Sequence, residues 1–257
     1  SFNEIRDLIS QTARLEFKLL DDANPFFRQL SETYDESTGP EGLVFRTEGV
    51  PLGQDEKGDE LTGTGTYAFL PTREGETSNV TLERLREWAS SLSVPEDREI
   101  GFEIVREIVD QATQKEEEVG YRTYLLRSRA EITGDMIRDA AAIPDQSSTS
   151  LGGWLVQLRF SDKGGRLFGK ITSENIKRRF AIILDGEIES APRINDAITG
   201  GSSVITMGAQ DPAVQLRESK ALELVLRSGA LPAPISPTNE QRIGPSLGKD
   251  SIRLGVE

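Results

Sequence analysis

Carboxylates are the only plausible general acids or bases in this chain, because its 257 residues include no histidine and no cysteine. That composition excludes Cys/His and Ser-His nucleophiles, disulfides and the usual kinds of zinc site. The tightest carboxylate cluster is Asp185, Glu187 and Glu189, around a predicted hairpin turn. Glu187 and Glu189 would share one strand face about 7 Å apart, a separation that glycosidases use. A carboxylate-dependent glycan hydrolase is therefore one hypothesis, and a solvated hairpin face is the other, because no aromatic sugar platform accompanies the pair.

Two other glycine-rich or acidic segments do not fit known ligand sites. Gly63-Thr-Gly65 lacks the preceding strand, the third glycine and the lysine of a phosphate loop. Asp55 to Glu60 lacks the order of oxygen ligands that a calcium loop needs. We therefore predict no metal site and no cofactor.

The charge balance argues against nucleic acid and anionic membranes as partners. The chain has 30 Lys and Arg against 43 Asp and Glu, a formal net charge of −13, which repels phosphate groups. The best basic run, Lys177-Arg178-Arg179, is interpreted as a solvated edge before a strand. The longest apolar run, Phe180 to Leu184, is far shorter than the roughly 20 residues of a membrane span. We expect a soluble acidic binding or interaction domain.

The first half of the chain gives mixed signals about its elements. A helix around Ile5 is followed by a strand over 15–19, where apolar and charged residues alternate. Residues 31–79 are rich in glycine, threonine and acidic residues, so we expect an irregular, partly mobile insertion, most mobile over 35–79. A helix begins near Thr81 and runs to Leu92, and a second helical stripe is carried by Ile104, Ile108 and Ala112.

The second half has clearer boundaries and favours an α+β fold. Strands are predicted over 121–127, 154–160, 180–184 and 203–206, and helices after Thr133 and within 161–171. Asp185-Gly186 is typical of a two-residue hairpin turn that returns through 187–191. The last helix begins with Asp211 as N-cap and Pro212 as the first residue, and Gly229 follows its end.

Five short motifs follow one another in this second half. They are Phe180-Ala-Ile-Ile-Leu-Asp-Gly186, Ser190-Ala-Pro192, Ile198-Thr-Gly-Gly201, Arg227-Ser-Gly-Ala-Leu-Pro-Ala-Pro234 and Gly244-Pro-Ser-Leu-Gly248. In this order they resemble SecD, the subunit of the bacterial Sec translocase that works with SecF. Ile132-Thr-Gly-Asp-Met136 is similar to the family's entry into a mobile head, and Thr12 to Phe17 is similar to a strand of its base. The resemblance covers roughly residues 3–21 and 121–257.

The resemblance implies a large periplasmic domain between the first and second membrane helices of an inner-membrane protein. Its expected fold is a ferredoxin-like base assembled from discontinuous segments, with an inserted α+β head. The base would take residues 1–21 and 211–245, the insertion 22–121, the head 122–210, and the membrane-proximal end 246–257. The family's opening helix and strands have no counterpart here, so we expect strand 15–19 to have an unpaired edge.

The resemblance also implies a role without catalysis. The expected partners are unfolded secretory polypeptide, SecF and the SecYEG channel, and no nucleic acid. The full-length protein would lie in the membrane, whose helices carry the proton-conducting carboxylates, and the present fragment would be soluble. Gly186 and Gly201 would permit positive φ, and the prolines would end a helix or stiffen a turn. The motif residues carried over are Asp185, Gly186, Ser190, Ala191, Pro192, Gly200, Gly201, Gly229, Pro232, Gly244 and Pro245.

A last expectation concerns motion of the head. Two strands would connect it to the base, so a change of a few backbone angles at their ends could swing the head as a rigid body. The alternative is a fixed spacer. The hinge candidates are Arg127, Ser128, Arg129, Ala130, Thr206, Met207 and Gly208.

Overall fold

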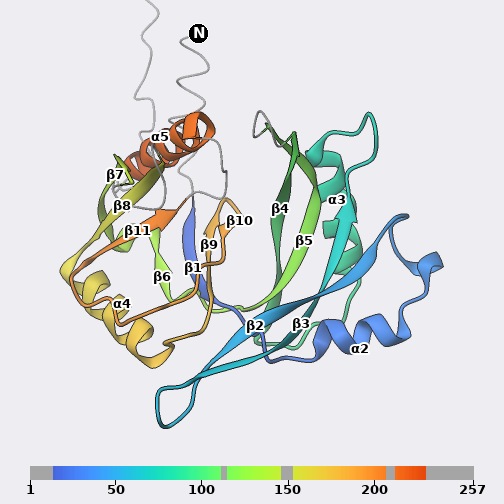
Figure 1. Cartoon of the computed structure of the whole chain (residues 1–257), viewed down its shortest axis with the longest axis horizontal. Coiled ribbons are helices and arrows are strands. Elements are labelled where there is room, and N and C mark those ends of the chain that lie inside the picture. The colour runs from blue at the N-terminus through green and yellow to red at the C-terminus, as the bar shows by residue number, and fades with distance from the viewer. Residues whose placement is uncertain (1–13, 111–114, 146–152, 207–211, 230–257) are drawn as a thin grey trace, which may run out of the picture.

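The protein has a mixed α+β architecture, seen in a computed structural model that describes residues 14–110, 115–145, 153–206 and 212–229. An eight-stranded sheet has the order β2-β3-β5-β4-β10-β9-β1-β6, and a three-stranded sheet has the order β11-β8-β7. Helices α2 and α3 lie at one end of the molecule and α4 and α5 at the other (Figure 1). The predicted α+β class is confirmed, and the ferredoxin-like base stays a prediction.

The described elements form two lobes, each with its own apolar core. The second lobe is built around β1 (Leu15–Leu19), which lies between β9 (Phe180–Leu184) and the short β6 (Ile132–Thr133). Phe17 of β1 is buried against the rings of Phe160, Phe168 and Phe180. The open edge predicted for strand 15–19 is therefore wrong, because β6 and β9 pair with both of its sides. The other elements of this lobe are β7 (Ile137–Pro144), β8 (Trp154–Phe160), α4 (Asp162–Glu174), β10 (Glu187–Ser190), β11 (Ser202–Thr206) and α5 (Pro212–Gly229).

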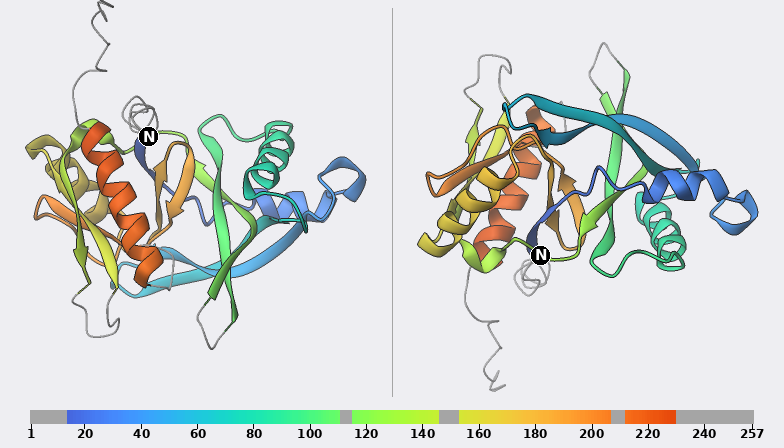
Figure 2. Two further views of the ribbon diagram at one scale, coloured as in Figure 1. Left: turned by 90° about the horizontal axis from the view of Figure 1, so that it is seen from above. Right: turned by 90° about the horizontal axis from the view of Figure 1, so that it is seen from below.

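Helices α4 and α5 close the core of the second lobe. Ser161 caps α4, since its hydroxyl accepts a hydrogen bond from the amide of Gly164. Leu222 and Leu226 of α5 share one apolar cluster with Phe17, and α5 lies across β7 and β8 (Figure 2). β1 and α5, at opposite ends of the described chain, therefore stabilise the same core.

The first lobe has a separate core. It contains α2 (Phe26–Thr33), the 3₁₀ turn Glu36–Thr38, β2 (Val44–Gln54), β3 (Glu60–Pro71), α3 (Ser78–Ser90), β4 (Arg98–Asp110) and β5 (Lys115–Arg127). Leu82, Leu85 and Trp88 of α3 are buried against one face of the sheet, beside Phe102 and Tyr121. The helix predicted near Thr81 is confirmed and begins three residues earlier, at Ser78.

The two lobes meet at a small junction. The parallel pairing of β10 with β4 holds a single residue pair, Ile188 and Glu103. A third apolar cluster bridges the lobes there, and β2–β3 reaches from the side of α2 toward the second lobe (Figure 2). The cluster consists of Leu20, Tyr124, Leu126, Ala181, Ile183 and Ile188.

Three predicted elements are wrong. Residues 44–71 form the long hairpin β2–β3 and not an irregular segment. Its glycines serve cross-strand packing: a Cβ on Gly65 would lie 2.7 Å from Cγ1 of Val50. The helical stripe at 104–112 falls mainly on β4, and the helix predicted after Thr133 is the 3₁₀ turn Gly134–Met136 followed by β7.

The elements predicted for the second half are otherwise confirmed. Strand 154–160 and strand 180–184 have the predicted bounds, and α4 covers the predicted helix. α5 begins at Pro212 and ends at Gly229, which is its last residue and not the residue after it. The helix predicted around Ile5 and the N-cap Asp211 predicted for the last helix lie outside the described residues.

Candidate functional site

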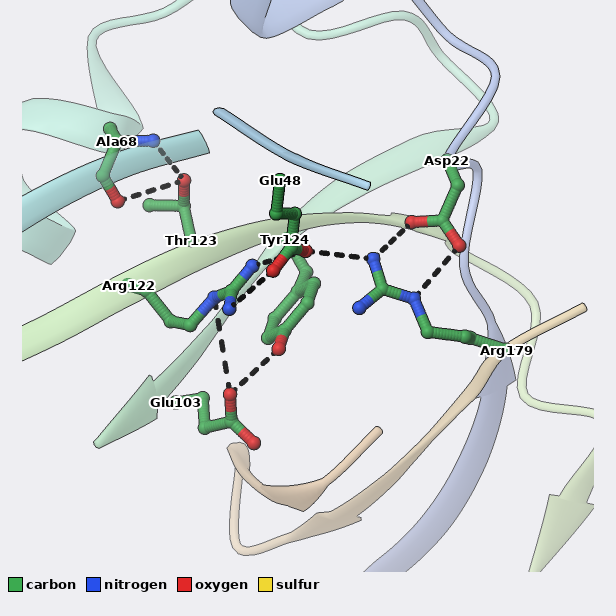
Figure 3. Close-up of polar contacts among 8 residues, drawn as sticks. All are labelled: Asp22, Glu48, Ala68, Glu103, Arg122, Thr123, Tyr124 and Arg179. Carbon is green, nitrogen blue, oxygen red and sulfur yellow. Dashed lines mark hydrogen bonds and ion pairs between the residues drawn. The ribbon is translucent and has the colours of Figure 1, made fainter. Parts of the chain in front are cut away.

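A network of charged side chains lies where the two lobes meet. It joins Asp22, just after β1, and Arg179, just before β9, to Glu48 of β2 (Figure 3). Arg122 of β5 and Glu103 of β4 continue the network on the same sheet. Residues paired directly across strands share a face of the sheet. Arg122 pairs with Phe69 and with Glu103, so these three side chains lie on one face, and α3 packs on the other.

Arg179 is the centre of the contact between the lobes. Its Nε and Nη2 donate to the two carboxylate oxygens of Asp22, at 3.0 and 2.6 Å. Nη2 also donates to Oε1 of Glu48 at 3.0 Å. A guanidinium held in this way by a bidentate partner has a fixed orientation, so Arg179 ties the first lobe's hairpin to the second lobe.

Arg122 holds the other side of Glu48. Its Nη1 and Nη2 donate to the Glu48 carboxylate at 2.9 and 2.5 Å. The guanidinium also lies 3.8 Å from the ring centroid of Tyr67 and 4.4 Å from that of Tyr124. Ring faces attract cations, so Arg122 is fixed by charge and by stacking together.

The environment shifts the acidities of the network in opposite directions. Burial acts to raise the pKa of Glu48, but hydrogen bonds and charge from Arg122 and Arg179 outweigh it and lower this pKa. Glu103 has a raised pKa, chiefly because it is buried, although it accepts a hydrogen bond from the Tyr124 hydroxyl at 2.7 Å. Burial and the charge of Glu103 raise the pKa of Tyr124 as well.

A second set of contacts fixes the far end of the hairpin. Nη1 of Arg193 donates to both oxygens of Glu60, at 2.7 and 2.9 Å. Gly53 has φ of 121°, and a Cβ there would lie 3.2 Å from Nε of Arg178. The β2–β3 hairpin therefore crosses from one lobe to the other and is ion-paired at both Glu48 and Glu60.

The first set of hinge candidates lies between the two cores. Arg127 ends β5, and β6 of the second lobe begins at Ile132. The amide of Ser128 donates to the carbonyl of Asp97, and the amide of Glu131 donates to that of Phe17, so Arg129 and Ala130 lie between two anchored residues. Thr206 ends β11, and Met207 and Gly208 lie outside the described residues. The hinge stays a prediction.

Comparison with known proteins shows which proteins the chain is similar to. The SecDF P1 head subdomain family matches residues 107–233. The protein translocase subunit SecD of Anaeromyxobacter dehalogenans is 34% identical over 98% of this chain. The chain is related to SecD. It spans 40% of the length of that relative, and a match to SecD of Acetobacter pasteurianus is 41% identical over 49% of this chain and 23% of that protein.

One of the solved structures similar to the chain is titled "Structure and function of a membrane component SecDF that enhances protein export". It is 24% identical, and the alignment covers 86% of this chain and 96% of that chain, with a TM-score of 0.35. A superposition as loose as this carries no argument about the fold.

Several SecD motif residues form turns in the second lobe. Asp185 and Gly186 have φ of 51° and 86°, which confirms the two-residue hairpin between β9 and β10. Asp185 also accepts a hydrogen bond from the amide of Arg14 at 2.8 Å, beside the start of β1. Gly201 has φ of 68°, as predicted. Pro232, Gly244 and Pro245 lie outside the described residues.

The other described motif residues serve packing and loop structure. Ala191 packs against the bridging apolar cluster, and the carbonyl of Pro192 accepts a hydrogen bond from the amide of Phe180. Ser190 ends β10, and Gly200 precedes the positive-φ Gly201.

The predicted arrangement of Glu187 and Glu189 is wrong. A β-bulge between Ile188 and Ser190 breaks the alternation of β10. Glu187 accepts a hydrogen bond from the Tyr121 hydroxyl at 3.4 Å and lies 3.7 Å from Arg86. Glu189 instead lines a hollow with Glu103, so the two carboxylates do not share one site.

The network was missed because its members are far apart in the sequence. Arg179 was interpreted as part of a solvated basic run, yet its side chain is only 14% exposed. The signal was the basic residue directly before one buried strand and the Asp21-Asp22 pair after another. Within the described parts of the chain, no three acidic side chains are grouped as a metal site, and no helix there is long and apolar enough to cross a bilayer.

Proposed function

We propose that this chain is the periplasmic domain of a SecD-type subunit that contacts unfolded secretory polypeptide and assists late translocation. The observation that carries the proposal is the match of residues 107–233 to the SecDF P1 head subdomain. One relative, similar over 98% of the chain, is a protein translocase subunit. SecF and SecYEG are the proposed partners in the intact complex, and the membrane part outside this chain supplies the proton flow.

Motion of one lobe against the other is the proposed mechanical contribution. Each lobe has its own apolar core, so a rotation would disturb the smaller cluster that bridges the lobes and leave both cores packed. Within the described residues, two chain crossings connect them, at residues 20–25 and 127–131. Crossings of a few residues can absorb the backbone changes of a hinge. Arg127, Ser128, Arg129 and Ala130 belong to the second of these crossings. Thr206, Met207 and Gly208 stay hinge candidates between β11 and α5, and they are not part of the crossings between the two lobes.

The charge network is proposed to hold the two lobes together until this hinge opens. Glu48 and Asp22 share Arg179, and ion pairs can exchange partners or water at lower cost than an apolar core can be opened. The raised pKa of Glu103 puts a group that takes up protons beside Arg122. No observation favours the alternative of a glycan hydrolase, because the carboxylates proposed for it have separate surroundings.

Crosslinking tests the polypeptide contact. A labelled secretory precursor is arrested in the intact reconstituted translocase, and photo-activatable residues are distributed over the exposed surface of both lobes. We expect crosslinks to the precursor that disappear when it is released from the channel. Absence of crosslinks from every exposed position, with SecYEG crosslinking retained as the positive control, would contradict the proposal.

A further inference from the structure

The outer strand β2 is a free edge of the large sheet. It is the terminal strand of the eight, and β3 pairs with its inner side along the whole length from Val44 to Gln54. Among the described residues, the backbone of 44–50 has no hydrogen-bond partner other than β3. Val44 is 44% exposed, and Thr47 and Gly49 are exposed as well.

Over residues 44–50 this edge lacks lysine, proline and bulges, three features that block strand addition. Natural edges carry lysine, proline, bulges or short strands. In β2 the proline and the bulge fall at Pro51 to Gly53, close to the second lobe. The preceding residues, 44–50, contain no proline and no lysine, so a regular edge remains available for another extended chain.

A hollow opens beside this edge on the sheet face opposite α3. Its volume is about 240 Å³, and it is lined by Arg46, Tyr67, Phe69, Glu103, Ile104, Val105, Arg106, Arg122 and Glu189. Arg46 comes from β2 itself and stacks 3.9 Å from the centroid of Phe69. No carboxylate in the described chain pairs with Arg46, whose side chain is exposed.

The lining of the hollow decides which side chain it accepts. A carboxylate entering it would meet Glu103 and Glu189, and a cation would meet Arg46 and Arg122. The remaining surface is made of ring, aliphatic and guanidinium faces, on which an aromatic ring can stack. A side chain on an added strand opposite Arg46 would lie about 5 Å from it, Cβ to Cβ, and could reach the hollow.

We propose that β2 receives an extended polypeptide segment as an added strand, with an aromatic or large apolar side chain over Arg46 and Phe69. Backbone pairing suits a partner of many sequences, because it uses groups that every residue except proline provides. The hollow adds a preference for one kind of side chain. This inference rests on the proposed function and names the surface at which the polypeptide contact would occur.

Site-specific crosslinking in the intact translocase tests the surface. A photo-activatable residue is placed at Thr47 on β2, at Val204 on the edge strand β11 of the small sheet, or at Glu83 on the exposed side of α3. The probe is a labelled secretory precursor arrested in the channel. We expect strong crosslinks from Thr47 and weak ones from the two control positions.

The outcomes separate this inference from the proposed function. Crosslinks at other positions but not at Thr47 overturn the β2 surface and leave the proposed function standing. No crosslinks anywhere overturn both. Crosslinks from Thr47 to a second copy of the same chain also overturn the inference, because the edge would then pair with itself.

Two proline substitutions test for backbone pairing. Alternate residues of an edge strand turn their N–H groups away from the sheet. Of the two variants Arg46→Pro and Thr47→Pro, one therefore removes a backbone hydrogen bond to β3, and the other removes an N–H donor that points outward. The variant that keeps the parent's thermal midpoint should reduce crosslinking from an adjacent probe at Val44 about tenfold, as expected for losing backbone hydrogen bonds. Full crosslinking in that variant would overturn strand addition.

Arg46→Ala tests the side-chain preference without changing the backbone. The precursor carries phenylalanines in the arrested segment, and a matched precursor carries serines there. We expect the parent to crosslink the phenylalanine precursor more strongly from Thr47, and the variant to lose that difference. An unchanged preference would show that the hollow does not receive the side chain.

Discussion

The core of the second lobe and the junction between the lobes are stabilised by different means. Phe17 lies in an apolar core, where it contacts three other phenylalanine rings. At the junction, six apolar residues are flanked by Asp22, Glu48 and Arg179. An apolar core loses stability when any part of it opens, whereas an ion-paired rim can be solvated as it separates. The comparison teaches that the lobes should hold their shapes while their contact changes.

The largest effect on stability is expected from the apolar core of the second lobe. Phe17→Ala removes a ring that is only 2% exposed and contacts Phe160, Phe168 and Phe180. The cavity should lower the free energy of unfolding by about 4 kcal/mol. Chemical denaturation measures this, with Val44→Ala on the exposed edge as the control. A loss below about 0.5 kcal/mol, the usual range of surface changes, would show that this core is not the main support of the lobe.

An intermediate effect is expected from the junction. Glu48→Gln leaves Arg122 and Arg179 without one of their carboxylates, which should cost about 3 kcal/mol at neutral pH. Glu83→Gln on the surface of α3 is the matched control. The loss should shrink in an Arg122→Met background, because a double-mutant cycle isolates the pair. Equal losses in both backgrounds would contradict the coupling.

The pH dependence of this variant has a definite sign. The pKa of Glu48 is lowered in the folded protein, so its contribution is present above the unfolded pKa of about 4.3 and disappears as the pH falls through the folded pKa. The difference between Glu48→Gln and the parent should therefore close on acidification. A difference that widened at low pH would contradict the ion-pair origin of the effect.

The smallest effect on stability is expected at Glu103, and its pH dependence has the opposite sign to that of Glu48. Burial raises its pKa, so the stability linked to its proton is present at low pH and is lost as the pH rises through the folded pKa. Glu103→Gln keeps an acceptor for the Tyr124 hydroxyl and carries no charge. The variant should be as stable as the parent at acidic pH and more stable than the parent at neutral pH, as measured by thermal unfolding. A variant that became less stable than the parent at neutral pH would contradict the burial argument.

The predictable parts of the fold are those with regular local signals. Leu15 to Leu19 alternates cleanly, and α5 begins with proline in its first turn. β4 was mistaken for a helix partly because a bulge between Ile108 and Asp110 interrupts its period of two. Residues 137–144 include three consecutive alanines, a helical signal that pairing with β8 overrides.

The site was less predictable than the fold. The charge network depends on β9 lying antiparallel to β1, which brings Arg179 close to Asp22 across 157 positions of sequence. It also depends on the hairpin crossing to the second lobe, and glycine-rich composition hid that hairpin. The motifs of the second half were recognisable because turns such as Asp185-Gly186 are local. Ion pairs between distant strands leave no such local pattern.

Locking the hairpin to the second lobe tests most directly whether the junction must open. Glu60→Cys and Arg193→Cys replace a pair whose side chains meet across the junction, and the sequence has no native cysteine. A short bifunctional maleimide joins them in the reconstituted complex. The control pair, Arg159→Cys with Ser202→Cys, lies in register within the small sheet of the second lobe. We expect the lobe-to-lobe crosslink to stop translocation and the control crosslink to leave it unchanged. Full translocation with the lobes crosslinked would contradict a moving junction and support a fixed spacer.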